Sequence, residues 1–290
     1  MRTSPAPIAA RAAGADGRLR RERVIGWLLL AVAVVLGVPA AAFLAQDRML
    51  FLPHLAVPPR GLRPPRPVEA VELVTPEGPR LRGWFAPALG GGPAPLIVYY
   101  GGNAEDVTGQ AFEPWPENWA LALVNYRGYG ASEGRPSEQA LCGDAEVVLD
   151  ALARRPDVDA ARIVLVGRSL GTGVATYVAA RRPVRAVVLI SPYDSMVVLA
   201  GHHYPFLPVR WLLRHRFDSI GRAPGIRTPL LAIAGERDEV IPPGSSRRLY
   251  DAWGGAKRWV VIPEANHNDL GQQRSFWGPI LAFLGVARGG

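Results

Sequence analysis

Ser169 is the residue of this 290-residue chain whose surroundings best suit a nucleophile. It lies in Gly167-Arg168-Ser169-Leu170-Gly171, a G-x-S-x-G pattern between an apolar run and a helical one. A serine at a sharp strand-to-helix turn needs glycine neighbours, and the N-terminus of the following helix stabilises developing negative charge. The pattern therefore predicts Ser169 as a nucleophile and the backbone N–H of Leu170 as an oxyanion donor.

Candidates for a base and an acid follow Ser169 along the chain. A predicted strand at 230–234 leads to Asp238, and another at 259–262 leads to His267. Because the carboxyl ends of parallel strands meet at one edge of a sheet, we predict Asp238 as the acid and His267 as the base. Glu236 and Asp194 remain as alternative acids. Asp269 is predicted instead to stabilise the histidine loop, the segment at 263–269 that carries His267.

A second oxyanion donor is expected after the predicted strand at 96–100. That strand leads into Gly101-Gly102-Asn103, where two glycines permit a close approach to the nucleophile. We predict that the backbone N–H of Asn103 completes the oxyanion hole together with that of Leu170. A simple glycine turn is the alternative.

The elements that must position these residues begin at Val68. Strands are predicted at 68–75, 80–86, 96–100, 120–125, 163–166, 186–190, 230–234 and 259–262, with helices at 137–153, 171–181, 245–253 and 273–284. Continuously apolar strands separated by helices are typical of a parallel sheet covered on both faces. The prediction is an α/β catalytic domain over 68–290, with a mostly parallel, doubly wound sheet and a short lid at 195–227.

Taken together, these motifs resemble the α/β-hydrolase superfamily. Within it, the chain is similar to membrane-anchored serine hydrolases related to α/β-hydrolase-domain-containing proteins and serine aminopeptidase-like enzymes. The matching segments are 46–53, 101–105, 125–130, the G-x-S-x-G turn at 167–171, 217–219, 235–242 and the loop that carries His267. The family often has His-Gly where this chain has Gly101-Gly102. Because the donor is a backbone N–H, we expect the oxyanion hole to be retained.

The composition excludes several other kinds of site. The single Cys142 excludes a disulfide scaffold, an iron–sulfur cluster and a multi-cysteine zinc site, and the single Lys257 lies in no phosphate-loop motif. The five histidines have no standard metal-ligand spacing, and adjacent His202 and His203 lack further ligands. We therefore expect no cofactor and no metal, and a buried, inert Cys142.

Residues 24–46 form an uncharged run rich in Leu, Val and Ala. As a helix, 23 residues measure roughly 34 Å, enough to cross a hydrocarbon core of about 30 Å. A retained transmembrane helix is the preferred interpretation, and the resemblance at 46–53 favours it. The alternatives are a signal peptide cleaved near Ala40–Ala42 and a buried soluble helix. Pro39 is expected to kink the helix or end it.

The net charge of +8 is unevenly distributed. Residues 1–23, a basic N-terminal tail, hold six arginines and two acids, whereas 47–67 form a proline-rich segment predicted to be an irregular connector. The positive-inside rule predicts a cytoplasmic N-terminus and an extracytoplasmic, periplasmic catalytic domain. The basic residues adjoin an apolar span and no basic–aromatic stripe follows, so nucleic acid is not an expected partner.

The sequence therefore predicts a membrane-anchored serine hydrolase acting on ester or thioester bonds of a small-molecule or lipid-like acyl substrate. A peptidase using the same triad and a non-catalytic, membrane-anchored binding protein are the alternatives. Apolar lid side chains either pack on the sheet or form an acyl-binding wall; they are Tyr204, Phe206, Leu207, Trp211, Leu212 and Leu213.

Overall fold

The computed structural model describes residues 8–59, 61 and 63–285, and the chain divides into two units, Met1–Gln46 and Asp47–Gly290. The described part of the first unit is a single helix, α1 (Ile8–Leu50), whose last residues belong to the second unit. Pro39 does not end the helix, which runs on to Leu50. The residues directly after the apolar run, predicted as irregular, are therefore helical. The next turn is the short 3₁₀ helix η1 (Pro53–Leu55).

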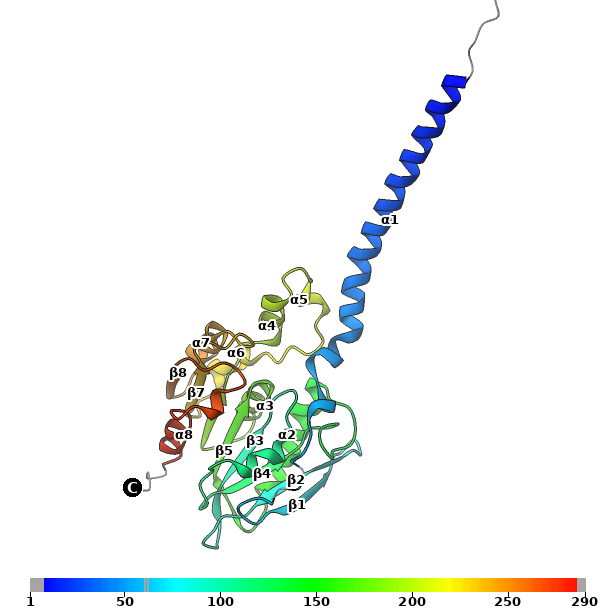
Figure 1. Ribbon diagram of the computed structural model, residues 1–290. Helices are drawn as coiled ribbons and strands as arrows, with labels where there is room; N and C mark the ends of the chain where they lie inside the picture. Colours follow the sequence, from blue (N-terminus) through cyan, green and yellow to red (C-terminus); the bar gives the residue numbers. More distant parts are fainter. Residues whose placement is uncertain (1–7, 60, 62, 286–290) are drawn as a thin grey trace, which may run out of the picture. The chain divides into compact units, whose positions relative to one another are not determined.

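The second unit contains one eight-stranded sheet with the order β1-β2-β4-β3-β5-β6-β7-β8 (Figure 1). Its strands are β1 (Glu69–Val74), β2 (Arg80–Ala86), β3 (Ala94–Tyr100), β4 (Ala120–Val124), β5 (Val158–Arg168), β6 (Ala186–Ile190), β7 (Leu230–Gly235) and β8 (Lys257–Ile262). β2 pairs antiparallel with both β1 and β4, and the pairs from β4 to β8 are parallel. The mostly parallel α/β sheet is confirmed.

Helices lie in the connections between parallel strands: α2 (Glu138–Leu152), α3 (Leu170–Ala179), α7 (Pro243–Ala252) and the 3₁₀ turn η2 (Val107–Phe112). The 3₁₀ turn η4 (Leu270–Gln272) and α8 (Trp277–Leu284) follow the last strand, β8. Ser137 caps α2, because its side chain accepts from the N–H of Ala140. Ser169 occupies the first position before α3.

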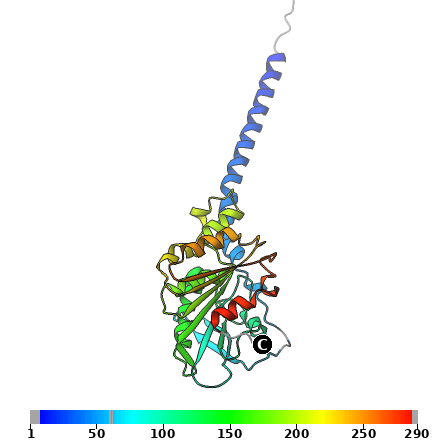
Figure 2. The same ribbon diagram turned by 90° about the vertical axis from the view of Figure 1, so that its left-hand side faces the viewer.

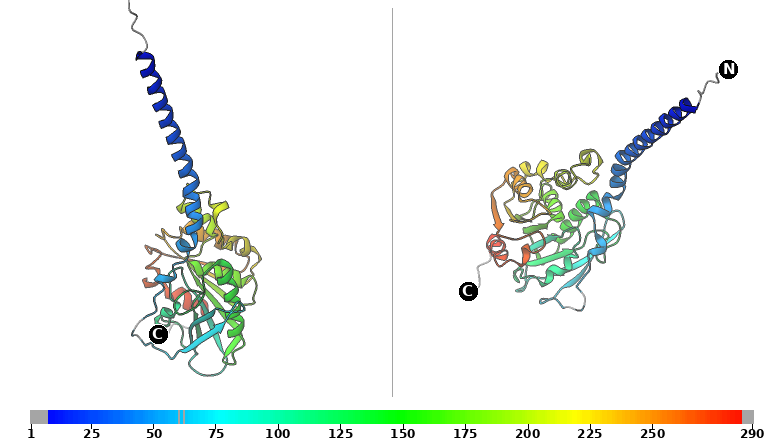
Figure 3. Two further views of the ribbon diagram at one scale, coloured as in Figure 1. Left: turned by 90° about the vertical axis from the view of Figure 1, so that its right-hand side faces the viewer. Right: turned by 45° about the horizontal axis from the view of Figure 1, so that its top comes forward.

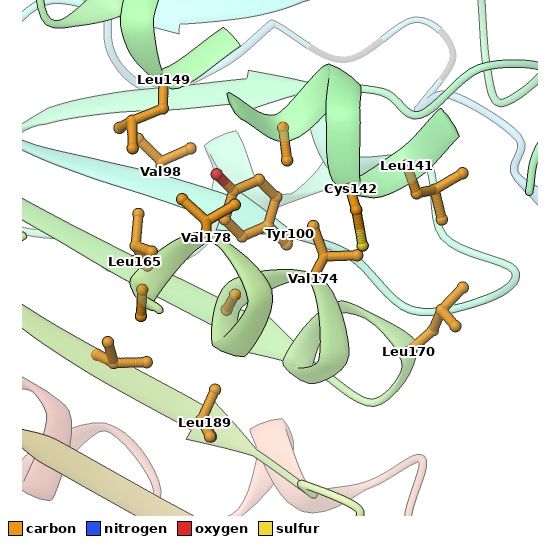
Figure 4. Close-up of a cluster of buried hydrophobic side chains, with 14 of the residues drawn as sticks. Val98, Tyr100, Leu141, Cys142, Leu149, Leu165, Leu170, Val174, Val178 and Leu189 are labelled. Carbon is orange, nitrogen blue, oxygen red and sulfur yellow. The ribbon is translucent and has the colours of Figure 1, made fainter. Parts of the chain in front are cut away.

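Two apolar cores lie on opposite faces of the sheet, as the alternation along β3 illustrates. Leu96, Val98 and Tyr100 pack into the core under α2 and α3, which Figure 4 shows in close-up. Ile97 and Tyr99 enter the other core, which includes residues of η2 and α8. Figure 2 shows α8 in red against the sheet. β3, β6 and β7 are buried along their whole length, which explains why their sequences are continuously apolar rather than alternating.

The predicted lid at 195–227 consists of short helices between β6 and β7. They are α4 (Met196–His203), α5 (Val209–Leu212), α6 (Ser219–Arg222) and the 3₁₀ turn η3 (Ala223–Gly225). Of the apolar side chains predicted here, Leu213 packs against the core, whereas Phe206 and Trp211 are 72% and 86% exposed. Packing on the sheet therefore accounts for only part of this set.

Candidate active site

Ser169 occupies the sharp turn between β5 and α3 in a backbone conformation that L-residues rarely adopt. Its φ is 51° and its ψ is −118°, and its N–H donates to the carbonyl of Ile190 at 2.9 Å. The turn closes only because its neighbours lack side chains. A Cβ on Gly167 would lie 2.5 Å from the Gly171 carbonyl oxygen, and one on Gly171 would collide with that of Tyr100. The spacing of the G-x-S-x-G pattern is thus a steric requirement of this turn.

The structure brings the predicted acid and base to Ser169. His267, in the loop after β8, places Nε2 3.0 Å from Ser169 Oγ and Nδ1 2.8 Å from Asp238 Oδ2. A carboxylate only accepts, so Nδ1 carries the proton and Nε2 is left to accept from the serine hydroxyl. The order of hydroxyl, imidazole and carboxylate suits removal of the Ser169 proton.

Asp238 is held ionised although it is buried. Its Oδ1 accepts from the N–H groups of Val240 and Ile241 at 3.0 and 2.7 Å, leaving Oδ2 for His267. Burial on its own would raise the pKa of Asp238. The hydrogen bond and charge of His267, followed by the Ile241 N–H, outweigh burial and hold the pKa below its ordinary value.

The alternative acids serve other purposes in the fold. Asp194 accepts from the N–H of Ser195 and from the side chains of Ser245 and Arg248. Glu236 accepts from the N–H of Glu264 at 3.1 Å. Both carboxylates are thus engaged with partners other than the histidine ring.

The loop after β8 is stabilised from within by Asp269. Its carboxylate accepts from the backbone N–H and the side-chain amide of Asn266, at 2.8 and 2.6 Å. These bonds fix the residue directly before His267.

Both residues predicted as oxyanion donors lie close to the nucleophile in the structure. Leu170 begins α3, and the loop carrying Asn103 passes Ser169 so closely that a Cβ on Gly102 would lie 3.8 Å from Ser169 Cβ. In the described part of the chain, the N–H groups of Asn103 and Leu170 donate to no protein acceptor. Two such groups beside a nucleophile suit the developing charge of a tetrahedral intermediate.

The departure at Gly101 has a local steric cause. A Cβ there would lie 2.6 Å from Val107 Cγ1 at the start of η2. The side chain of a histidine does not fit this backbone, so the loop is built around glycine.

Residues that sequence reasoning gave no role hold the loop in place. The carbonyl of Asn103 accepts from the N–H of Leu52 at 2.9 Å and from the Tyr129 hydroxyl at 3.0 Å, and the Tyr126 hydroxyl donates to the Gly101 carbonyl at 3.2 Å. Fixing the carbonyl on one side of Asn103 restrains the N–H on its other side.

Glu105 also stabilises the loop that carries Asn103. Its carboxylate accepts from the N–H of Gly102 at 2.9 Å, from the Tyr99 hydroxyl at 3.0 Å and from the side chains of Gln110 and Arg168. The only sequence signal for these supports is their place in the matching motifs, since a backbone N–H such as that of Leu52 leaves no signature.

Cys142 is buried between α2 and α3, as predicted. Burial raises the pKa of its thiol to about 12, so it is held in the thiol form that is poor as a nucleophile or ligand. The described residues contain no group of three or more His, Cys, Asp or Glu side chains arranged to hold a metal ion.

Comparisons with known proteins agree with this fold. The family described as "alpha/beta hydrolase fold" matches residues 100–216. An uncharacterized protein of Mycobacterium tuberculosis is 37% identical over 254 residues, covering 87% of this chain and 90% of that protein. The alpha/beta hydrolase domain-containing protein WAV2 of Arabidopsis thaliana is 30% identical over 275 residues, covering 82% of this chain and 87% of WAV2.

A solved structure has the same fold at lower identity. The acetyl xylan esterase of Paenibacillus sp. R4 aligns with a TM-score of 0.62 at 19% identity, over 77% of this chain and 89% of the esterase.

Proposed function

The chain belongs to the α/β-hydrolase family, and we propose that it is a serine hydrolase that cleaves carboxylic ester or thioester bonds through an acyl-serine intermediate. The observation that carries the proposal is the continuous hydrogen-bonded series from Ser169 through His267 to Asp238, with distances of 3.0 and 2.8 Å. It lies beside two backbone N–H groups that have no protein acceptor in the described chain.

The first half-reaction forms the acyl-enzyme. His267 Nε2 takes the hydroxyl proton of Ser169 while Oγ forms a bond to the carbonyl carbon of the substrate. The carbonyl oxygen becomes an oxyanion, which accepts from the N–H groups of Asn103 and Leu170. The bond to the alcohol or thiol then breaks, and His267 returns the proton to that leaving group.

The second half-reaction regenerates the serine. Water gives a proton to His267 Nε2 as its oxygen attacks the acyl carbon, and the same N–H groups bind the second oxyanion. The bond to Oγ breaks, Ser169 recovers its proton from His267, and a carboxylic acid leaves. Asp238 keeps Nδ1 protonated throughout, so that Nε2 always exchanges the proton.

The fold neighbours support ester bonds as the substrate class, since the Paenibacillus protein is an acetyl xylan esterase. Turnover of nitrophenyl esters of graded acyl length by the full chain tests the proposal, beside Ser169→Ala. We expect turnover in the parent chain and a loss of about 10⁴–10⁶ in kcat in the variant. Equal turnover by both chains contradicts the proposal.

A single-pass membrane location is part of the proposal. Within the described residues, α1 alone is long and apolar enough to cross a bilayer, with a mean hydropathy of 2.6 over its most apolar 18-residue window. The arginines concentrated before the span favour a cytoplasmic N-terminus and an extracytoplasmic, periplasmic catalytic domain. A protease-accessibility experiment tests this orientation. The catalytic domain is expected to be protected in intact cells and to be digested once the outer membrane is permeabilised.

A further inference from the structure

The lid contains a basic and aromatic surface segment, Tyr204–Arg216. Phe206 and Trp211 are among the most exposed large apolar side chains of the second unit, and the ring of Tyr204 meets that of Phe206 at 6.4 Å. Large aromatic side chains in water forgo a substantial gain from burial, and clustered examples mark interaction surfaces.

The charges of the segment are of one sign. Arg210, Arg214 and Arg216 are exposed, and the sequence from Ser195 to Phe217 holds no Asp or Glu. Exposed aromatic rings among arginines match the surface of a bilayer with anionic lipids, because the rings suit the headgroup boundary and the guanidinium groups suit phosphates.

The C-terminal end of the segment is hydrogen-bonded to Asp47, the residue that directly follows the apolar span. Asp47 Oδ1 accepts from Arg214 Nη2 at 2.8 Å and from His215 Nε2 at 2.9 Å. The His215 ring also meets that of buried Phe51, with centroids 5.0 Å apart. Since Asp47 is bonded to Gln46, the last residue of the span, a chain anchored by that span holds Arg214 at the level of the headgroups.

Trp211 lies close enough to Arg214 to reach the lipid headgroups as well. It is three residues from Arg214, so their Cα atoms are at most about 11 Å apart. At its other end the segment adjoins the active site, since His203, directly before Tyr204, donates from Nε2 to the carbonyl of Val240 at 2.8 Å. Val240 in turn donates its N–H to the carboxylate of Asp238.

We propose that the segment Tyr204–Arg216 docks on the bilayer that carries α1, with Phe206 and Trp211 among the lipid headgroups and upper acyl chains. This inference rests on the proposed membrane anchoring. Together with the proposed hydrolysis, it assigns the acyl substrate a route from the bilayer to Ser169, because His203, directly before the docked segment, contacts the loop that holds Asp238.

The test follows a fluorescent dye on the full-length chain reconstituted in vesicles of phosphatidylcholine and phosphatidylglycerol. The nitrobenzoxadiazole dye is attached to Trp211→Cys in a Cys142→Ala background. The matched control is Ser275→Cys, an exposed position just before α8, which lies apart from α4 and α5 in Figures 1 and 3. Both chains carry Ser169→Ala, so the result does not depend on the proposed hydrolysis.

Docking predicts a blue-shifted dye at 211 that is quenched by spin-labelled lipid, and an unshifted, unquenched dye at 275. The shift is expected to weaken in vesicles of phosphatidylcholine alone and with Arg210→Gln. An aqueous, unquenched dye at 211 on chains that float with the vesicles overturns the docking and leaves the hydrolase proposal intact. A shift without lipid quenching that grows with the protein-to-lipid ratio assigns the surface to a second copy of the chain, which also overturns it.

Discussion

Replacing Asp238 with asparagine inverts the protonation of the catalytic imidazole. In the parent chain Oδ1 accepts two backbone N–H groups, from Val240 and Ile241, and Oδ2 accepts from His267 Nδ1. An asparagine keeps its only oxygen toward the two N–H groups, because the opposite orientation leaves the half-buried N–H of Val240 and the buried N–H of Ile241 unpaired, the latter at about 1–3 kcal/mol. Its NH₂ group therefore faces His267 and donates to Nδ1.

The imidazole then carries its proton on Nε2, the atom that must accept from Ser169. A base with the wrong tautomer lowers kcat by about 10⁴, or roughly 5–6 kcal/mol of transition-state stabilisation. Because asparagine has the shape of aspartate, the fold is expected to persist. The KM for the ester is expected to change little, since substrate binding does not involve Asp238.

The assay is steady-state turnover of a short nitrophenyl ester by Asp238→Asn, with thermal unfolding recorded on the same preparation. Glu236→Gln is the matched control, because Glu236 belongs to the same loop and is one of the two alternative acids. Turnover by Asp238→Asn within tenfold of the parent chain, or a large loss in Glu236→Gln instead, refutes the reasoning from the hydrogen-bond geometry.

Three other predictions follow from the same structure. Tyr129→Phe removes one hydrogen bond to the Asn103 carbonyl, worth about 1 kcal/mol, and is expected to lower kcat about fivefold at unchanged KM. A change in KM alone contradicts the role of Tyr129 in holding the oxyanion loop. Arg127→Met leaves Asp144 unpaired in the interior and is expected to destabilise the fold by about 3–5 kcal/mol, measured by denaturant titration; a loss below 1 kcal/mol is the contrary result. Cys142 is expected to resist iodoacetamide at pH 8 in the native chain and to react on unfolding, because its pKa of about 12 keeps it protonated; rapid labelling of folded protein is inconsistent with this burial.

The sheet could be predicted from the sequence because its central strands are buried on both faces and therefore continuously apolar. The prediction was less complete where strands reach the surface. β5 was expected at 163–166 but runs from Val158 to Arg168, since its first part includes polar side chains such as Asp159. Similarly, the helix expected at 273–284 begins only at Trp277, after the separate 3₁₀ turn η4.

The candidate site was predictable in part, for a physical reason. Chemistry selects serine, histidine and aspartate by type, and the glycines of the turn by their lack of a side chain, so both are visible in the sequence. The supports of the oxyanion loop act through backbone groups, as Leu52 does, or through side chains whose partners lie far along the chain, as Tyr129 does. Their role depends on folding and could not be inferred before the structure.

The measurement that tests the central claim most directly is the location of a covalent adduct after reaction with a fluorophosphonate. The full chain, detergent-solubilised, is labelled, digested and mapped by mass spectrometry, beside Ser169→Ala and His267→Ala. One adduct is expected on Ser169 in the parent chain and none in Ser169→Ala. Labelling of His267→Ala is expected to be strongly slowed, because Nε2 no longer removes the hydroxyl proton. An adduct on another residue, or ester turnover by a chain whose Ser169 remains unmodified, contradicts the assignment of Ser169 as the nucleophile.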